Sequence, residues 1–304
     1  VAPHRPPGPR SCGSTLLGGE LQTGRELSDV RAIQQSAMEE SGDVLAKKRR
    51  LAIPPRLISF SCRLVAAPMV GASDLAFRLL CRRHGADTCY TEMLFSERLL
   101  SDEAYRRRKL KTCVDDRPLI VQLQGNDPAT VAAAAALVER TCPCDAIDLN
   151  LGCPLPQAEA QVFGAYLLGR EHWPTLGRIV ERILESTSLP VTAKIRLLES
   201  SEETLALCRV LAAAGCSLIA IHGRERPAAE LHRGQRQTVA ADLDAIRDVA
   251  QAMGATPLLL SNGNTQAPRD VLLNLQQTGA HGIMAAEGLL RDPRLFEEGA
   301  AVLG

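Results

Sequence analysis

The chain has 304 residues, of which 45% are hydrophobic but only 3% aromatic, and it carries 35 basic and 35 acidic side chains. A core of this size must be aliphatic, which favours a parallel α/β architecture over an aromatic-rich β-sandwich. The balanced charge excludes a global basic field, so any contact with nucleic acid must come from a local patch.

The ten cysteines form no Cys-x-x-Cys pair and show no regular spacing. This argues against a zinc site, and we expect no bound metal and a reduced, intracellular protein. No apolar run approaches the roughly 20 residues that a membrane span requires, so we expect no membrane contact. The composition does not specify an oligomeric state.

Residues 1–58 differ from the rest of the chain, and we predict that they form a poorly ordered N-terminal arm. Residues 1–19 are rich in Pro, Gly and Arg and contain no acidic side chain, as in some transit peptides. The Lys-Lys-Arg-Arg cluster at residues 47–50 is compatible with a nuclear signal, although solvated linker charge is the preferred interpretation. We therefore predict a cytoplasmic or nuclear location, with organelle targeting left open.

From residue 59 onward, short apolar runs alternate with helical patterns. Eight strands are expected, at residues 64–67, 88–91, 119–123, 147–150, 191–196, 218–222, 257–261 and 282–285. Helices are expected at residues 73–85, from Asp127-Pro128 onward, and at 164–187, 200–215, 242–253 and 269–278. Eight strands that alternate with helices predict an α/β (β/α)8 TIM barrel over residues 59–304.

The fourth strand ends abruptly in a Gly-Cys-Pro turn, within the stretch at residues 145–154. Gly152 permits unusual backbone angles, and Pro154 fixes the direction of exit. A thiol at Cys153 would then be placed at the mouth of the barrel rather than merely packed. A buried structural cysteine is an equally good interpretation of this stretch alone.

Nearly every expected strand is followed by a polar or glycine-containing turn, and in this fold those turns form the active site. The turns after strands seven and eight, with Gly263 and Gly288, suit a phosphate held by backbone N–H groups. Lys194 from strand five is suited to stabilise negative charge on a ring system. The marker residues are Met69, Glu92, Gln122, Asn150, Cys153, Lys194, Arg196, His222, Arg224, Asn262, Gly263, Asn264, Ala286, Glu287 and Gly288.

Several motifs occur in the order seen in tRNA-dihydrouridine synthases, and residues 63–296 resemble that family. The most specific of them is the Asn-x-Gly-Cys-Pro element at residues 150–154. The others are Ala67-Pro68-Met69, Tyr90-Thr91-Glu92-Met93, Val121-Gln122, Lys194-Ile195-Arg196, His222-Gly223-Arg224 and Ser261-Asn262-Gly263-Asn264. Residues 82–86 and 284–288 look most like the eukaryotic branch that acts on D-loop positions 16 and 17.

The resemblance implies an enzyme that reduces uridine in tRNA to 5,6-dihydrouridine, with FMN as cofactor and NADPH or NADH as reductant. Hydride from reduced FMN would go to C6 of uracil and a proton from Cys153 to C5, after the uridine has left its stack. The implied cofactor residues are Pro68, Met69, Val70, Gln122, Lys194, His222, Asn262, Gly263, Asn264, Ala286 and Glu287. The implied substrate residues are Glu92, Asn150, Arg196 and Arg224.

The chain departs from the family pattern at several positions. Glu159 and Ala160 stand where the family usually has basic residues, and Ala286-Glu287 replaces a common Gly-Arg. Residues 225–237 do not match the usual loop, and we expect the family's C-terminal helical domain to be absent from this chain. We therefore predict weak tRNA binding and low dihydrouridine synthesis.

The basic run at residues 106–111 has two interpretations of equal weight, a phosphate contact and a solvated helix face. Two other functions stay open as well. One is an FMN barrel oxidoreductase that acts on a small molecule, as dihydroorotate dehydrogenase does, although the Gly-Cys-Pro element speaks against it. The other is a degenerate barrel that binds FMN or RNA without catalysis.

Overall fold

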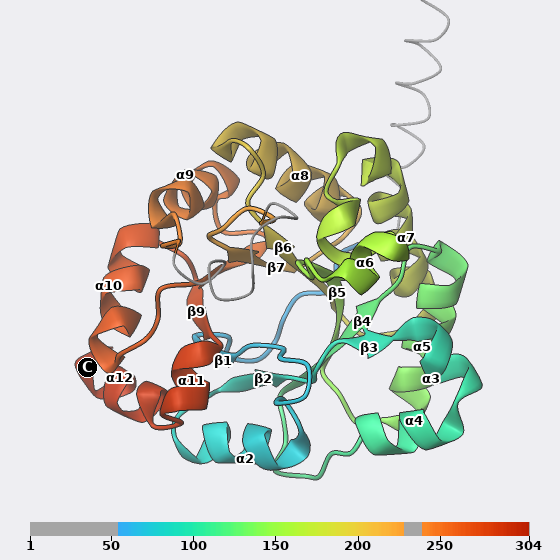
Figure 1. Ribbon diagram of the computed structural model, residues 1–304, viewed down its shortest axis with the longest axis horizontal. Coiled ribbons are helices and arrows are strands. Elements are labelled where there is room, and N and C mark those ends of the chain that lie inside the picture. The colour runs from blue at the N-terminus through green and yellow to red at the C-terminus, as the bar shows by residue number, and fades with distance from the viewer. Residues whose placement is uncertain (1–53, 228–238, 304) are drawn as a thin grey trace, which may run out of the picture. The chain divides into compact units, whose positions relative to one another are not determined.

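The computed structural model describes residues 54–227 and 239–303, and they contain a closed barrel of parallel strands surrounded by helices (Figure 1). The strands are β1 (Leu64–Ala66), β2 (Thr88–Tyr90), β3 (Leu94–Phe95), β4 (Leu119–Gln124), β5 (Ala146–Leu151), β6 (Val191–Arg196), β7 (Leu218–His222), β8 (Leu258–Asn262) and β9 (Gly282–Ala285). The helices are α2 (Leu75–Arg83), α3 (Ser96–Ser101), α4 (Glu103–Lys109), α5 (Pro128–Thr141), α6 (Pro156–Ala160), α7 (Trp173–Ser186), α8 (Ser201–Ala213), α9 (Leu243–Met253), α10 (Pro268–Thr278), α11 (Glu287–Arg291) and α12 (Leu295–Leu303).

The barrel closes because β2 pairs with both β1 and β4, while β1 pairs with β9. Every pairing is parallel. The short strand β3 continues along β4 beyond the end of β2. The TIM barrel predicted from the sequence is confirmed, and strands 191–196, 218–222 and 282–285 have the predicted bounds.

Aliphatic side chains explain why these segments form strands. All six residues of both β4 and β5 are buried, which is the pattern of strands covered on both faces. One buried cluster, which includes Val65, Tyr90, Ile120, Leu218 and Leu260, brings together residues from β1, β2, β4, β7 and β8. A larger cluster joins the outer faces of β4 to β8 to the helices around them.

Most of the predicted helices begin at the expected caps. Asp127, Ser200 and Asp242 accept hydrogen bonds from the backbone N–H groups of Thr130, Glu203 and Ala245. The prediction of one continuous helix over residues 164–187 was wrong. It consists of two 3-10 turns, η1 (Gly164–Leu167) and η2 (Arg170–His172), followed by α7, which has Pro in its first turn.

The segment between β2 and β4 contains structure that the sequence did not predict, namely β3, α3 and α4. Helix α4 begins where the Asp102 side chain accepts the Tyr105 N–H. It carries most of the basic run, and several of its cations have partners. Arg106 donates to the Leu99 carbonyl (2.6 Å), and Arg107 pairs with Glu103.

The predicted signals within residues 1–53 lie outside the described residues, as does most of the loop at residues 225–237. Residues 54–58 of the predicted arm are described, and Arg56 donates to the carbonyls of Leu184 (3.0 Å) and Leu189 (3.3 Å). Across the described ranges, we find no helix with the length and apolar character needed to cross a bilayer.

Candidate active site

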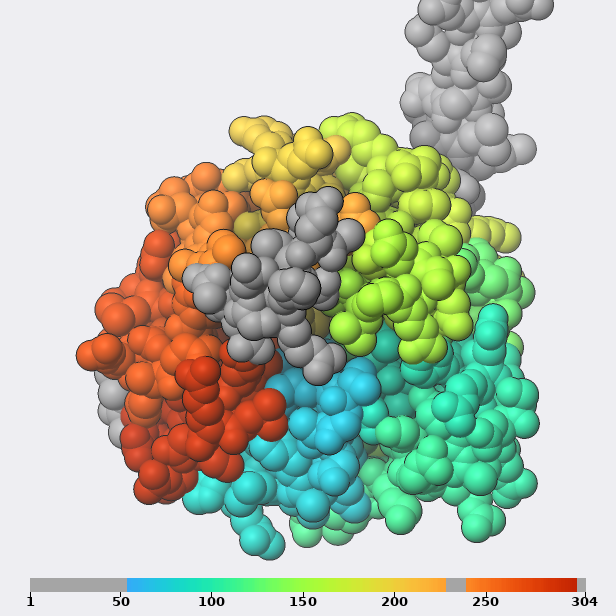
Figure 2. All heavy atoms as spheres, viewed as in Figure 1, coloured from blue at the N-terminus to red at the C-terminus, as the bar shows by residue number. Residues whose placement is uncertain are grey.

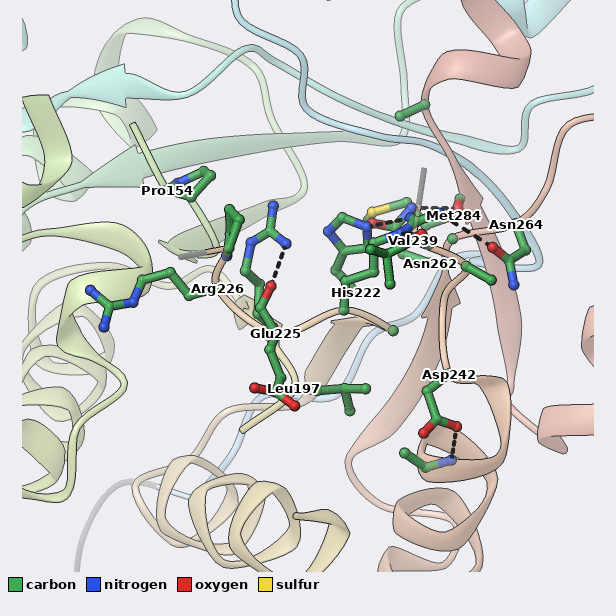
Figure 3. Close-up of a pocket in the computed structure, with 18 of the residues that line it drawn as sticks. Pro154, Leu197, His222, Glu225, Arg226, Val239, Asp242, Asn262, Asn264 and Met284 are labelled. Carbon is green, nitrogen blue, oxygen red and sulfur yellow. Dashed lines mark hydrogen bonds between the residues drawn. The ribbon is translucent and has the colours of Figure 1, made fainter. Parts of the chain in front are cut away.

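A pocket of about 670 Å³ opens at the C-terminal ends of β6 to β9. Eight of the predicted site residues line it, namely Arg196, His222, Arg224, Asn262, Gly263, Asn264, Ala286 and Glu287. In the close-up, His222, Asn262 and Met284 lie together, whereas Arg226 extends toward the other side of the pocket (Figure 3). The space-filling view shows α10 to α12, in orange to red, on one side of the molecule and α6, in yellow-green, toward the other (Figure 2). One pocket therefore contains the residues predicted to hold the phosphate, after β8 and β9, and two predicted substrate residues, Arg196 and Arg224.

Gly263 lines this pocket after β8, and Gly288 lies next to the lining residue Glu287, in the first turn of α11. Gly263 has a φ of +128°, and a Cβ added to it would lie 2.6 Å from the Ala241 Cβ. A Cβ added to Gly288 would overlap the Thr265 carbonyl oxygen. Only glycine therefore allows the turns after β8 and β9 to approach their neighbours this closely.

The side chain of Asn264 is used within the protein. Its Oδ1 accepts the Ala241 N–H (2.8 Å) and its Nδ2 donates to the Ala241 carbonyl (2.9 Å). Asn262 likewise donates to the Met284 carbonyl (2.8 Å), which joins β8 to β9. These amides fix the shape of the turns, so any anion here would be held mainly by the main chain.

Arg224 organises the inner wall of the pocket. Its Nη1 lies 2.9 Å from His222 Nε2, and its Nη2 donates to Asn264 Oδ1 (3.3 Å). Burial lowers the pKa of Arg224, and the carboxylate of Glu287 acts in the opposite direction. Burial also holds the pKa of His222 well below its usual value, and the positive charges of Lys194, Arg196 and Arg224 lower it further.

Lys194 lies deeper, on β6, between Asn150 on β5 and Ala220 on β7 in the strand register. Part of its side chain reaches solvent, yet burial among protein atoms is the largest influence on its ammonium. Burial and the charge of Arg196 lower the pKa of Lys194 to about 7, while Asp148 opposes this. At neutral pH such a lysine is about half-protonated, and a negative charge that develops on a bound ring would favour its protonated form.

The Gly-Cys-Pro turn is held from three directions. Asn150 Oδ1 accepts the N–H groups of Gly152 (3.2 Å) and Cys153 (3.1 Å). Arg196 Nε donates to the Gly152 carbonyl (2.7 Å), and the Cys153 carbonyl accepts the Ala165 N–H (3.0 Å). The turn is therefore fixed to β5, β6 and η1.

The Cys153 side chain is half-buried and packs against a cluster of Met93, Ala158 and Phe163. Burial raises the pKa of its thiol, while a hydrogen bond with the Leu155 backbone and the charge of Arg196 act in the opposite direction. The sulfur therefore stays protonated at neutral pH, as a proton donor must. Pro154 and Leu155, which follow it, line the pocket.

Behind the turn, a chain of hydrogen bonds leads into the barrel. Asn150 Nδ2 donates to Gln122 Oε1 (2.7 Å), and Gln122 Nε2 donates to Asp148 (2.9 Å). Asp148 also accepts from Thr192 Oγ1 (2.5 Å). Burial raises the pKa of Asp148 to about 7. Sequence reasoning missed Asp148, although its spacing of two from Asn150 places both side chains on one face of the strand.

The remaining predicted residues follow β1 and β2 and do not line the pocket as described. The Ala67 N–H donates to the Ala285 carbonyl (2.9 Å), which places residues 68–70 beside the turn after β9. Val70 is 62% exposed at this edge. Glu92 pairs with Lys109 (2.6 Å) and accepts the Gly71 N–H (3.3 Å), so it connects α4 to the loop after β1.

Glu159 lies exposed on α6, and its carboxylate accepts the Tyr166 hydroxyl (3.4 Å). The guanidinium of Arg226 lies 4.5 Å from the centroid of the Tyr166 ring. The unusual carboxylate is thus near the rim of the pocket, with a cation on the adjacent ring. Among the described residues, no group of three or more potential ligands could hold a metal ion.

Comparison with known proteins gives a consistent result. A family model described as "Dihydrouridine synthase (Dus)" matches residues 64–303. A Mus musculus protein named "tRNA-dihydrouridine(16/17) synthase [NAD(P)(+)]-like" is 43% identical over 237 residues, which are 77% of this chain and 48% of the relative. The Schizosaccharomyces pombe "tRNA-dihydrouridine(16/17) synthase [NAD(P)(+)]" is 36% identical over 76% of this chain and 56% of its own length. A Homo sapiens "tRNA-dihydrouridine(20a/20b) synthase [NAD(P)+]-like" is 33% identical, over 76% and 70%. The chain spans about half the length of the first two relatives.

Proposed function

The chain belongs to the dihydrouridine synthase family, and from this premise we propose that it reduces a uridine of tRNA to 5,6-dihydrouridine. The relatives named for positions 16 and 17 reach 43% identity and those named for 20a and 20b reach 35%. This difference supports uridines 16 and 17 as the targets. We propose that it works in the cytoplasm or the nucleus, and an organelle that holds tRNA stays open.

We propose FMN as the bound cofactor and NADPH or NADH as its reductant. The glycines at positions 263 and 288 support this, because glycine lets the main chain pack closely on its neighbours and lets backbone N–H groups approach a phosphate. The full set of residues that would hold FMN is Pro68, Met69, Val70, Gln122, Lys194, His222, Asn262, Gly263, Asn264, Ala286 and Glu287. When bound and reduced, FMN supplies the hydride that is added to C6 of uracil.

The observation that carries the proposal is the placement of Cys153. Its thiol stands on a turn held by Asn150 and Arg196, beside the pocket, and its raised pKa keeps the proton on sulfur. In the proposed reaction this proton goes to C5 of uracil as the hydride arrives at C6, and the thiolate regains a proton from water. The net change is addition of two hydrogens across one double bond.

Substrate recognition would involve Arg196 and Arg224, which line the pocket, and Glu92 and Asn150 beside it. Asn150 already uses both ends of its amide within the protein. We therefore propose that it acts mainly by holding the cysteine turn. The two arginines supply the positive charge that would meet an RNA backbone.

The test has two stages. The purified chain is titrated with FMN and followed by flavin absorbance, and the loaded protein is then given NADPH and unmodified tRNA. Binding of FMN and a gain of two mass units at a D-loop uridine support the proposal. Reduction of a free pyrimidine without RNA would favour a small-molecule oxidoreductase. Flavin binding without any reduction of uridine would favour a non-catalytic barrel.

A further inference from the structure

We propose that Asp148 is a positioning residue that fixes the orientation of two side-chain amides, Gln122 and Asn150, and through them the turn that carries Cys153. The inference rests on the proposed function for its catalytic consequence. Its structural basis is the continuous hydrogen-bond chain from Asp148 to the Cys153 backbone.

The chain begins in the barrel interior, where Asp148 is fully buried. The oxygen that faces Gln122 accepts from Nε2 at 2.9 Å, and the other oxygen faces Thr192 Oγ1 at 2.5 Å. Because a carboxylate only accepts, the amide nitrogen of Gln122 must point toward Asp148. The carbonyl oxygen of Gln122 must then point the other way.

The next amide is fixed in turn. Gln122 Oε1 faces Asn150 Nδ2 at 2.7 Å, so the oxygen of Asn150 faces the backbone of the turn. There it accepts the N–H groups of Gly152 and Cys153. If both amides were reversed, the Asn150 nitrogen would meet two N–H donors, and buried donors without acceptors are strongly disfavoured.

This order does not depend on the charge of Asp148. Protonation on the oxygen that faces Thr192 lets Asp148 donate to that hydroxyl, while the other oxygen still accepts from Gln122. Asparagine at position 148 can make the same pair of contacts, with its oxygen toward Gln122 and its nitrogen toward Thr192. What the chain requires of residue 148 is therefore an acceptor toward Gln122.

The test reverses the donor and acceptor roles along this series of hydrogen bonds. Asn150→Asp keeps the acceptor for the two N–H groups but cannot donate to Gln122, so Gln122 must reverse and present its oxygen to Asp148. An ionised Asp148 cannot donate to that oxygen, whereas the amide introduced at position 148 in the double variant Asp148→Asn/Asn150→Asp can. All three variants are nearly isosteric with the wild type.

The readout is the rate at which iodoacetamide alkylates Cys153 in cofactor-free protein between pH 6 and 9, measured by mass spectrometry on the peptide that contains Cys153. We expect Asp148→Asn to stay within about threefold of wild type. Asn150→Asp should change the rate about 10-fold or more at the upper end of this pH range, where Asp148 is ionised, in the range seen when groups that orient site ligands are removed. The double variant should recover most of that change.

The rate of dihydrouridine formation in the FMN-loaded variants should follow the same order. The proposal would be overturned if the fold-change in rate of the double variant equalled the product of the two single fold-changes. It would also be overturned if Asp148→Asn changed the rate as much as Asn150→Asp. The alkylation experiment needs neither FMN nor tRNA. If the protein showed no synthase activity, the proposed function would be contradicted, but the role of Asp148 in ordering the two amides could still be tested by alkylation.

Discussion

Arg224 and His222 form a donor–acceptor pair in which the guanidinium Nη1 lies 2.9 Å from the imidazole Nε2. A guanidinium has no acceptor, so Nε2 must be the unprotonated nitrogen. His222 is then neutral with its proton on Nδ1, in agreement with the depressed pKa of the ring. The pair gives the pocket a fixed hydrogen-bond donor beside a cation.

The first prediction concerns pH and stability. Because the pKa of His222 is well below its usual value of about 6.5, the unfolded chain binds a proton in mildly acidic solution that the native chain does not. The stability that comes from a neutral His222 is complete above about pH 6.5 and is lost as pH falls below it. We expect His222→Gln to weaken this loss. Urea unfolding at pH 5, 6.5 and 8 measures it, and equal pH slopes for the two proteins would contradict the prediction.

The second prediction separates the two half-reactions. Cys153→Ala removes the proposed proton donor, so oxidation of the reduced flavin by tRNA should slow by about 10²- to 10⁴-fold. Flavin reduction by NADPH should change less than about twofold, since a proton to C5 is not needed there. Cys113→Ala is the matched control, because Cys113 is also half-buried but lies between α4 and β4. If both half-reactions fail together in Cys153→Ala, the cysteine is structural.

The third prediction concerns Glu159 on the exposed face of α6. Glu159→Lys should strengthen tRNA binding and steepen the dependence of log affinity on log salt by about 0.7 to 0.9 for one added phosphate contact. Asp115→Lys makes a similar charge change on the exposed loop that enters β4, at the other end of the barrel, and should leave the slope unchanged. Tight binding by the unmodified chain, or equal slopes in the two variants, would refute the idea.

The fourth prediction compares two glycines that both have positive φ. Gly263→Ala adds a Cβ that meets Ala241, whereas the space around Gly279, at the end of α10, is open. Both changes carry a backbone penalty: about 1–2 kcal/mol at Gly279, which is in the left-handed helical region, and more at Gly263, whose φ of +128° is outside it. Only Gly263→Ala should also weaken FMN binding, by about tenfold or more. The measurements are urea unfolding and FMN titration, and an FMN affinity that Gly263→Ala leaves unchanged would remove this turn from the cofactor site.

Much of the barrel was predictable because its strands are aliphatic and its helices start at recognisable caps. Residues 191–196 were predicted without error, since a β-branched start and a polar end bound the run. The segment from Glu92 to Lys109 was not predicted. Its helices are short, and the contacts that fix them, such as Tyr105 with the Phe95 backbone, join residues ten apart.

The sequence allowed candidate site residues to be named, but it did not allow their hydrogen-bond partners to be predicted. Motifs at the strand ends predicted Arg196 and Asn150 as groups that touch substrate, which stays a prediction, and gave no sign of their contacts within the protein. That Arg196 binds the Gly152 carbonyl, 44 residues away, follows only from the register of β5 against β6. Asp148 was overlooked because a single carboxylate in a buried strand has no sequence signal apart from its alternation with Asn150.

The contact of Arg56 with the end of α7 has a practical consequence for work on this protein. A barrel fragment cut at residue 59, the boundary drawn from composition, would remove a cation from the carbonyls of Leu184 and Leu189. Leu184 lies in the last turn of α7, where positive charge is favourable, and Leu189 lies in the segment between α7 and β6. Expression of the isolated barrel should therefore start at or before residue 54, and a shorter fragment should melt at a lower temperature.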